Sequence, residues 1–229
     1  MQQDRGLQFA GVHVAEARRG QAGSGARVVP VGLAGEQRHP QRPERGFLHD
    51  VAEPLLDELG TFLGPLILEI QENDIHEAEF CTLLDAFLRT VRSQYDGPLA
   101  VELRTSSHLT PRYLRVVHNH GVAHVLNSWT RMPAVGLQWD KLRALAELDW
   151  PFFLVRALLR PGMRYEDASI FDPYDRLVTR APDVRADILR VLREAPQDRT
   201  CYVLANNHLE GHSPGTISEL QTDLWGPPS

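Results

Sequence analysis

The stretch Cys201-Tyr-Val-Leu-Ala-Asn-Asn-His-Leu-Glu-Gly-His-Ser-Pro-Gly215 contains the features that decide the fold. Its apolar run ends at two adjacent amides, and a helix is expected to begin at Ser213-Pro214, because proline is favoured in the first turn of a helix. A short apolar run followed by a polar loop and a helix is typical of a buried strand in an α/β protein. The same order of elements recurs upstream.

From Phe47 onward the chain alternates between strand and helix patterns. Short apolar runs predict strands at 65–71, 98–104, 122–127, 152–157 and 201–205. Apolar residues at helical spacing predict helices at 48–59, 75–94, 110–120, 138–148, 182–194 and 214–225. Because most of these strands are apolar throughout and a helix follows each one, we expect an α/β fold with a parallel sheet and right-handed crossovers.

The first 46 residues have a different composition. Gly, Arg, Gln, Pro and His are frequent there, and no apolar periodicity is sustained. Residues 7–14 and 27–33 could form strands, whereas 20–25 and 38–45 have the composition of loops. We therefore expect an irregular N-terminal segment over 1–46, followed by the main domain over 47–229.

Composition argues against several classes of function. The net charge is −6, which argues against a nucleic-acid partner because phosphate binding needs an excess of basic residues. No apolar run reaches the roughly 18 residues of a membrane span. The two cysteines, Cys81 and Cys201, are far apart and match no metal or redox motif. A cytoplasmic protein is expected, and the sequence indicates neither a cofactor nor an oligomeric state.

Polar residues gather in the carboxyl-terminal part of the predicted strands. In α/β proteins this end of the strands holds ligand and catalytic sites. Glu69 and Glu102 are candidates for acid/base catalysis, and the other polar residues are candidates for ligand binding. The predicted ligand-binding residues are Gln71, Arg104, Asn127, Arg156, Asn206 and Asn207.

Some of these predictions have an alternative without a ligand. Glu102 and Arg104 could be held inside a barrel for strand register, each paired with a charge on a neighbouring strand. Asn206 and Asn207 could cap main-chain groups where their strand ends. His208 and His212 stand at metal-ligand spacing, but Gly211 places them on a loop and not on one face of a helix. No metal site is therefore predicted.

Several motifs occur together in a family-specific order. They include Val101-Glu-Leu-Arg104, Val125-Leu-Asn-Ser-Trp-Thr-Arg-Met-Pro133 and Asn206-Asn-His-Leu-Glu-Gly-His-Ser-Pro214. Over about 47–225 the chain closely resembles the domain of unknown function 72 family, the YecE-like proteins. The resemblance implies a TIM-type (β/α) barrel, and the family has no established biochemical function.

The resemblance is incomplete at the N-terminus. The family opens with Gly-Thr-Ser-Gly-Trp, Glu-Asn-Thr-Phe-Tyr-like and Phe-Arg-Phe strands, and none of these occurs in residues 1–46. The family's His-Pro-Ser-Trp reads Thr105-Ser-Ser-His108 here. The resemblance therefore implies an incomplete barrel with strands four to eight present and the first three missing or replaced.

Three functions remain open from the sequence. The first is an uncharacterised barrel protein that acts on a polar or anionic small molecule, sugar-like or phosphate-like, at the carboxyl ends of its strands. The second is a barrel that binds a ligand or nucleic acid without catalysis. The third is an inactive, truncated fragment. The sequence does not decide whether the protein is an enzyme.

Overall fold

A computed structural model describes residues 9–16, 34–37, 53–59 and 63–227. These residues form two compact units, which we describe separately. The first unit contains 9–16, 34–37, 53–59, 63–124 and 147–151, and the second contains 125–146 and 152–227. The boundary falls inside strand β5 (Ala123–Asn127), which contributes residues to both units.

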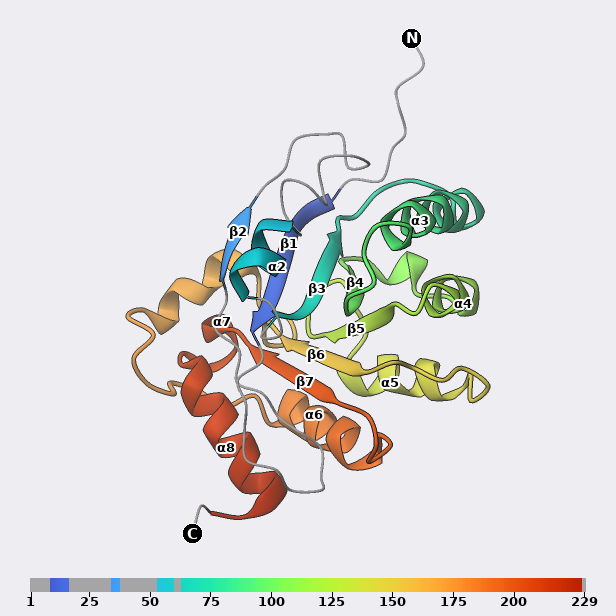
Figure 1. Cartoon of the computed structure of the whole chain (residues 1–229). Helices are drawn as coiled ribbons and strands as arrows, with labels where there is room; N and C mark the ends of the chain where they lie inside the picture. The colour runs from blue at the N-terminus through green and yellow to red at the C-terminus, as the bar shows by residue number, and fades with distance from the viewer. Residues whose placement is uncertain (1–8, 17–33, 38–52, 60–62, 228–229) are drawn as a thin grey trace. The chain divides into compact units, whose positions relative to one another are not determined.

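The first unit is built on strands β1 to β4 and the first two residues of β5 (Figure 1). Strand β1 is antiparallel to both β2 and β3, whereas β4 is parallel to β3 and to β5. Its elements are β1 (Phe9–Glu16), β2 (Ala34–Gln37), α2 (Glu53–Leu59), β3 (Leu63–Ile70), α3 (Glu77–Arg92), β4 (Leu99–Leu103), the 3-10 helix η3 (Ser106–His108) and α4 (Pro111–Asn119).

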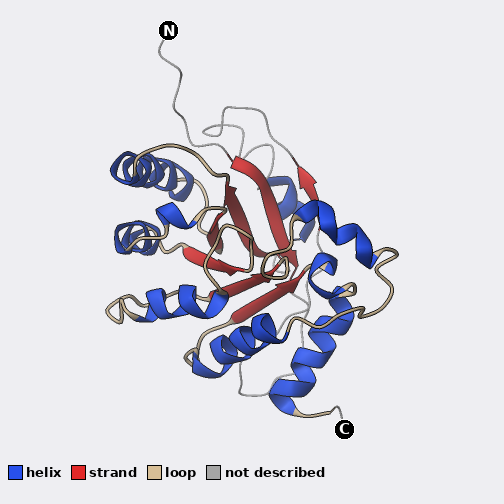
Figure 2. Ribbon diagram, turned by 180° about the vertical axis from the view of Figure 1, so that it is seen from behind, coloured by secondary structure: helices blue, strands red, loops and turns tan. Residues whose placement is uncertain are grey.

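Apolar burial explains why these segments form strands and helices. Strand β4 is buried throughout, and helix α3 turns Phe80, Leu84 and Leu88 inward. Burying a side chain of this size contributes roughly 1.5–3 kcal/mol. Helix α4 lies beside α3 (Figure 2) and begins as the sequence predicts, with Pro111 in its first turn and the Thr110 hydroxyl accepting from the Tyr113 amide at 3.2 Å.

The second unit contains the last three residues of β5 and two further strands. Strand β6 is parallel to β5, and β7 is parallel to β6. Helices α5 and α6 lie side by side, and α8 packs against both α6 and β7. The elements are α5 (Val135–Arg143), β6 (Phe153–Ala157), η4 (Tyr165–Phe171), α6 (Pro182–Glu194), β7 (Cys201–Ala205), α7 (Asn207–Glu210) and α8 (Ser213–Trp225).

The five predicted strands form and pair in parallel, so the predicted α/β class is confirmed. Two helical segments differ from the prediction. Helix α5 covers 135–143 and not 138–148, because the Asp187 carboxylate accepts from the Gly136 amide at 2.8 Å and thereby stabilises an earlier first turn. The loop expected after β7 contains the short helix α7. No helix in the described ranges has the length and hydrophobicity needed to cross a membrane.

The α/β part of the predicted fold is confirmed, whereas the incomplete TIM-type barrel with strands four to eight is not. Strands β3 to β7 are parallel, but β1 runs antiparallel to β3, whereas adjacent strands of a (β/α) barrel run parallel. The numbering as strands four to eight is therefore replaced by an α/β fold with five parallel strands, β3 to β7. Strand β1 overlaps the predicted strand at 7–14. The predicted strand at 27–33 and the domain boundary after residue 46 lie outside the described residues.

Candidate functional site

In the first unit, two predicted site residues lie next to each other on neighbouring strands. Glu69 of β3 and Glu102 of β4 are paired in the parallel register, so their side chains share one face of the sheet. They are only 4% and 0% exposed. Arg104 follows Glu102 by two residues and is also buried. The structure thus brings together three of the residues that the sequence singled out.

Arg104 bridges the two carboxylates. One guanidinium nitrogen donates to Glu69 Oε2, and the other lies 3.7 Å from Glu102 Oε1. The side-chain amide of Gln71 donates to Glu69 Oε1 at 2.9 Å. Glu69 therefore accepts hydrogen bonds on both of its oxygens, which is how an ionised carboxylate is held. The cluster can offer carboxylate acceptors and a guanidinium donor to a ligand.

In the second unit, Asn127 and Arg156 are paired in register at the carboxyl ends of β5 and β6. Both are buried, at 0% and 3% exposure. The Asn127 side-chain oxygen accepts from the Trp129 amide at 3.0 Å. Gln138, which the sequence reasoning missed, accepts from the Asn127 amide at 3.1 Å and donates to its carbonyl at 2.6 Å. These bonds fix the main chain where β5 ends.

The adjacent amides after β7 hold main-chain groups. The Asn206 Oδ1 accepts from the His208 amide at 2.9 Å, and the Asn207 Oδ1 accepts from the Ser213 amide at 2.7 Å. Asn206 is thereby the N-cap of α7. The side-chain oxygens of both residues therefore cap main-chain groups, as the alternative without a ligand predicts. A role of Asn206 and Asn207 in ligand binding stays a prediction.

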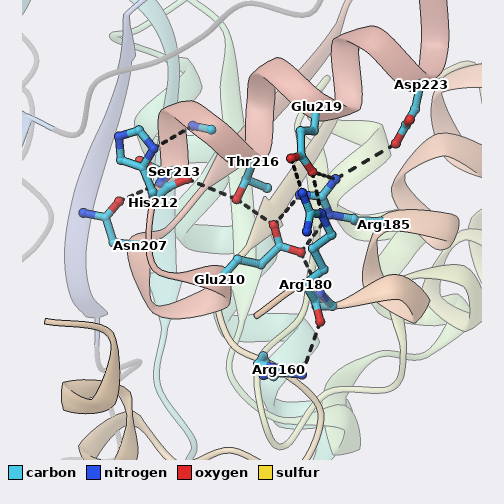
Figure 3. A network of polar contacts seen from close by, with 12 residues as sticks. Arg160, Arg180, Arg185, Asn207, Glu210, His212, Ser213, Thr216, Glu219 and Asp223 are labelled. Atoms are coloured by element: carbon cyan, nitrogen blue, oxygen red, sulfur yellow. Dashed lines mark hydrogen bonds and ion pairs between the residues drawn. The ribbon is translucent and has the colours of Figure 1, made fainter. Parts of the chain in front are cut away.

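Glu210 is the centre of a polar network in the second unit (Figure 3). Its carboxylate is fully buried. Oε1 accepts from the Ala181 amide at 2.6 Å and from Arg185 Nε at 2.7 Å. Oε2 accepts from Arg185 Nη2 at 2.6 Å and from the Thr216 hydroxyl at 2.8 Å. The network therefore joins α6, α7 and α8.

Electrostatics agree with a structural role for this network. Burial raises the pKa of Glu210, but its hydrogen bonds, those from Arg185 first, outweigh burial and leave the pKa below the ordinary glutamate value. Hydrogen bonding to Glu210 raises the pKa of Arg185. Arg185 also contacts Glu219 at 2.9 Å. Sequence reasoning missed Arg185, which lies on a helix and matches no motif.

The two histidines near Glu210 have other surroundings. His212 accepts from the Gly215 amide at 3.2 Å and so caps α8. Burial lowers the pKa of His208, whose ring packs against Tyr174 with centroids 5.5 Å apart. Within the part of the chain that the structure describes, no cluster of three or more His, Cys, Asp or Glu residues is arranged to hold a metal ion.

Comparison with known structures supports the fold. A DUF72 family protein from Thermotoga maritima MSB8 superposes with a TM-score of 0.51 and 18% identity, covering 80% of this chain and 66% of that one. A DUF72 family protein from Enterococcus faecalis V583 superposes with a TM-score of 0.54 and 18% identity, and the match covers 81% of this chain and 69% of that one. The chain thus spans about two thirds of the length of each. At this identity the similarity shows the fold alone.

Comparison with family models identifies the family. No curated protein matches the chain. The model for the protein of unknown function DUF72 matches residues 31–227. This match begins before Phe47, where the motif resemblance begins, and it covers most of the chain. The chain therefore belongs to the DUF72 family.

Proposed function

We propose that the chain binds a hydroxyl-rich small molecule, such as a sugar, at the carboxyl ends of β3 and β4. The observation that carries this proposal is the bridging of Glu69 and Glu102 by Arg104 at the ends of two parallel strands. Ligands of α/β proteins bind at this end of the strands. Buried charged groups in such a position are candidates for a site as well as for structural support.

The contacts favour binding over proton transfer. Glu69 accepts from Arg104 and from Gln71, so both of its oxygens are already engaged in hydrogen bonds. A carboxylate held in this way is well suited to accept a further hydrogen bond from a ligand and poorly suited to exchange a proton. We therefore propose that Glu69 and Glu102 orient a ligand, and their assignment as acid and base stays a prediction.

The charge of the cluster selects between the two ligand classes left open by the sequence. Two carboxylates at adjacent strand ends repel a phosphate group, whereas hydroxyl groups can donate to them. Arg104 can donate in turn to a hydroxyl or ring oxygen of the same ligand. A neutral sugar or polyol therefore fits this site better than a phosphorylated one.

Saturation-transfer NMR with D-glucose, D-xylose, glucose 6-phosphate and inorganic phosphate tests the proposal. We expect transfer to a neutral sugar in the native chain and about tenfold weaker binding in Glu102→Gln, because one charged hydrogen-bond acceptor is lost. Glu210→Gln is the matched control, since it changes another buried glutamate that is paired with an arginine. This variant should retain binding.

Two results would contradict the proposal. One is the absence of transfer to either neutral sugar, and the other is a preference for phosphate. Unfolding in urea must accompany the binding experiment. If Glu102→Gln changes the free energy of unfolding but leaves sugar binding intact, the cluster serves the strand register alone.

A further inference from the structure

A chain of hydrogen bonds joins the loops that follow β3 and β4 in the first unit. It begins at His108, the last residue of η3, whose Nε2 lies 3.1 Å from the Asn73 side-chain oxygen. The Asn73 side-chain nitrogen donates to the Gln71 carbonyl at 3.1 Å. The Gln71 side chain then donates to Glu69 at 2.9 Å. The chain therefore ends at the carboxylate that Arg104 holds.

Main-chain groups decide which way the Asn73 amide points. Its oxygen accepts from the Ile75 amide at 3.1 Å, while its nitrogen faces the Gln71 carbonyl. A flipped amide would place donor against donor and acceptor against acceptor. Because the Asn73 oxygen is an acceptor, His108 Nε2 must carry a proton and donate to it.

His108 is held firmly in its place. The residue is 3% exposed, and its ring stacks on Phe80 of α3 with centroids 4.0 Å apart and planes 3° apart. Burial lowers the pKa of His108, which favours the neutral ring. A neutral ring that donates from Nε2 carries no proton on Nδ1. This second nitrogen is buried and has no hydrogen-bond partner among the described residues.

We propose that His108 is a positioning residue for the site at the strand ends. Through Asn73 it holds the Gln71 carbonyl, and so it sets the direction from which the Gln71 side chain reaches Glu69. The ligand part of this inference rests on the proposed function. The hydrogen-bond chain itself can be tested without any ligand.

A second hydrogen bond, which does not involve His108, links the starts of α3 and α4. The Thr110 hydroxyl, at the start of α4, donates to Glu77 at the start of α3 at 2.6 Å. The side chain of Tyr113 also packs near Phe80, with ring centroids 6.3 Å apart. Removing the His108 hydrogen bond should therefore loosen the 71–75 loop and leave the packing of α3 against α4 in place.

The side-chain amide signals of Gln71 report directly on this chain of hydrogen bonds. His108→Phe retains an aromatic ring to stack on Phe80 but removes the donor, whereas His108→Gln retains a donor. In His108→Phe we expect the Gln71 amide protons to exchange with solvent about tenfold faster and their NMR signals to move toward those of a free amide. In His108→Gln both properties should stay near the native values.

Asn73→Asp provides a second route to the same result. It retains the oxygen acceptors for Ile75 and His108 but removes the donor to the Gln71 carbonyl. The Gln71 signals should change as in His108→Phe. Native-like Gln71 signals in both His108→Phe and Asn73→Asp, with urea midpoints showing that the variants are folded, would overturn the proposal.

Binding of D-glucose separates this inference from the proposed function. If the native chain binds D-glucose, His108→Phe should weaken binding about tenfold, and His108→Gln should restore it. If the native chain binds none of the sugars, the proposed function fails, while the Gln71 signals still decide whether His108 positions Gln71. Loss of D-glucose binding in His108→Phe with native Gln71 signals would contradict positioning through Asn73.

Discussion

Each unit of this protein buries an arginine among glutamates, but the two clusters are built differently. In the second unit, Glu210 accepts four hydrogen bonds, two on each oxygen, from groups on or next to two helices, α6 and α8. In the first unit, Arg104 bridges Glu69 and Glu102 from two adjacent strand ends, and its distance to Glu102 is 3.7 Å. That distance is longer than a hydrogen bond.

The difference shows that burial of an ion pair does not by itself distinguish support from function. A carboxylate with four donors at 2.6 to 2.8 Å has its acceptor capacity filled by the protein. A longer ion pair at the carboxyl end of a strand lies where ligands of α/β proteins bind. The Glu210 network therefore serves stability, whereas ligand binding at the Arg104 cluster is our proposal.

The largest effect on stability is expected from Glu210→Ala. This variant removes the acceptor of four buried donors, and we expect it to lower the free energy of unfolding by about 3 kcal/mol. Glu219→Ala is the control, because Glu219 contacts the same Arg185 but is partly exposed, at 34% for its side chain. Urea unfolding measures both. An equal loss in the two variants would contradict the central role of Glu210.

An intermediate effect on the free energy of unfolding is expected when acid protonates Glu210 and removes its charge. Its pKa in the folded chain is below the unfolded value. Its stabilisation is therefore complete above the unfolded pKa of about 4.3 and is lost as the pH falls through the folded pKa. The difference in unfolding free energy between the native chain and Glu210→Gln should stay constant from pH 7 to about pH 5 and shrink below about pH 4.

Urea titrations at several pH values test this expectation. They compare the native chain with Glu210→Gln, so that the other acidic groups contribute equally to both. A difference that grows as the pH falls would mean that Glu210 is protonated in the folded chain. The Glu210 network would then not be an ion pair, and the contrast with the Arg104 cluster would fail.

The smallest effect on stability is expected from an ion pair at the surface of the first unit. Arg89 and Asp85 form an exposed ion pair on α3 with a nitrogen–oxygen distance of 2.6 Å. Solvent screens such pairs, and ordering two long side chains costs entropy. Arg89→Gln should therefore leave the urea midpoint unchanged within error. A loss as large as that of Glu210→Ala would show that burial does not control the strength of these ion pairs.

The sequence predicted the parallel strands well, because local apolar runs and helix start signals depend on residues that are close along the chain. Strand β7 and helix α6 were predicted at the residues where they occur. Helix α5 was predicted less well, because an aspartate on α6 stabilises its first turn. A contact of this kind leaves no local signal in the sequence.

The candidate site was predicted in part. Glu69, Glu102 and Arg104 could be named because strand ends are visible as polar residues after apolar runs. Arg185 and Gln138 could not be named, since each acts through a partner distant in the sequence and neither matches a motif. The structural role of Glu210 could not be predicted for the same reason, although Glu210 lies inside the motif that indicated the family.

The sequence by itself determined the alternation of buried strands and helices, the family, and the polar character of the strand ends, because these follow from patterns of neighbouring residues. Only the tertiary structure decided that Glu69 lies beside Glu102 in the strand register and that Glu210 is enclosed by Arg185 and Thr216. Hydrogen bonds and ion pairs act over a few ångströms in space, so their partners are chosen by packing and not by position along the chain.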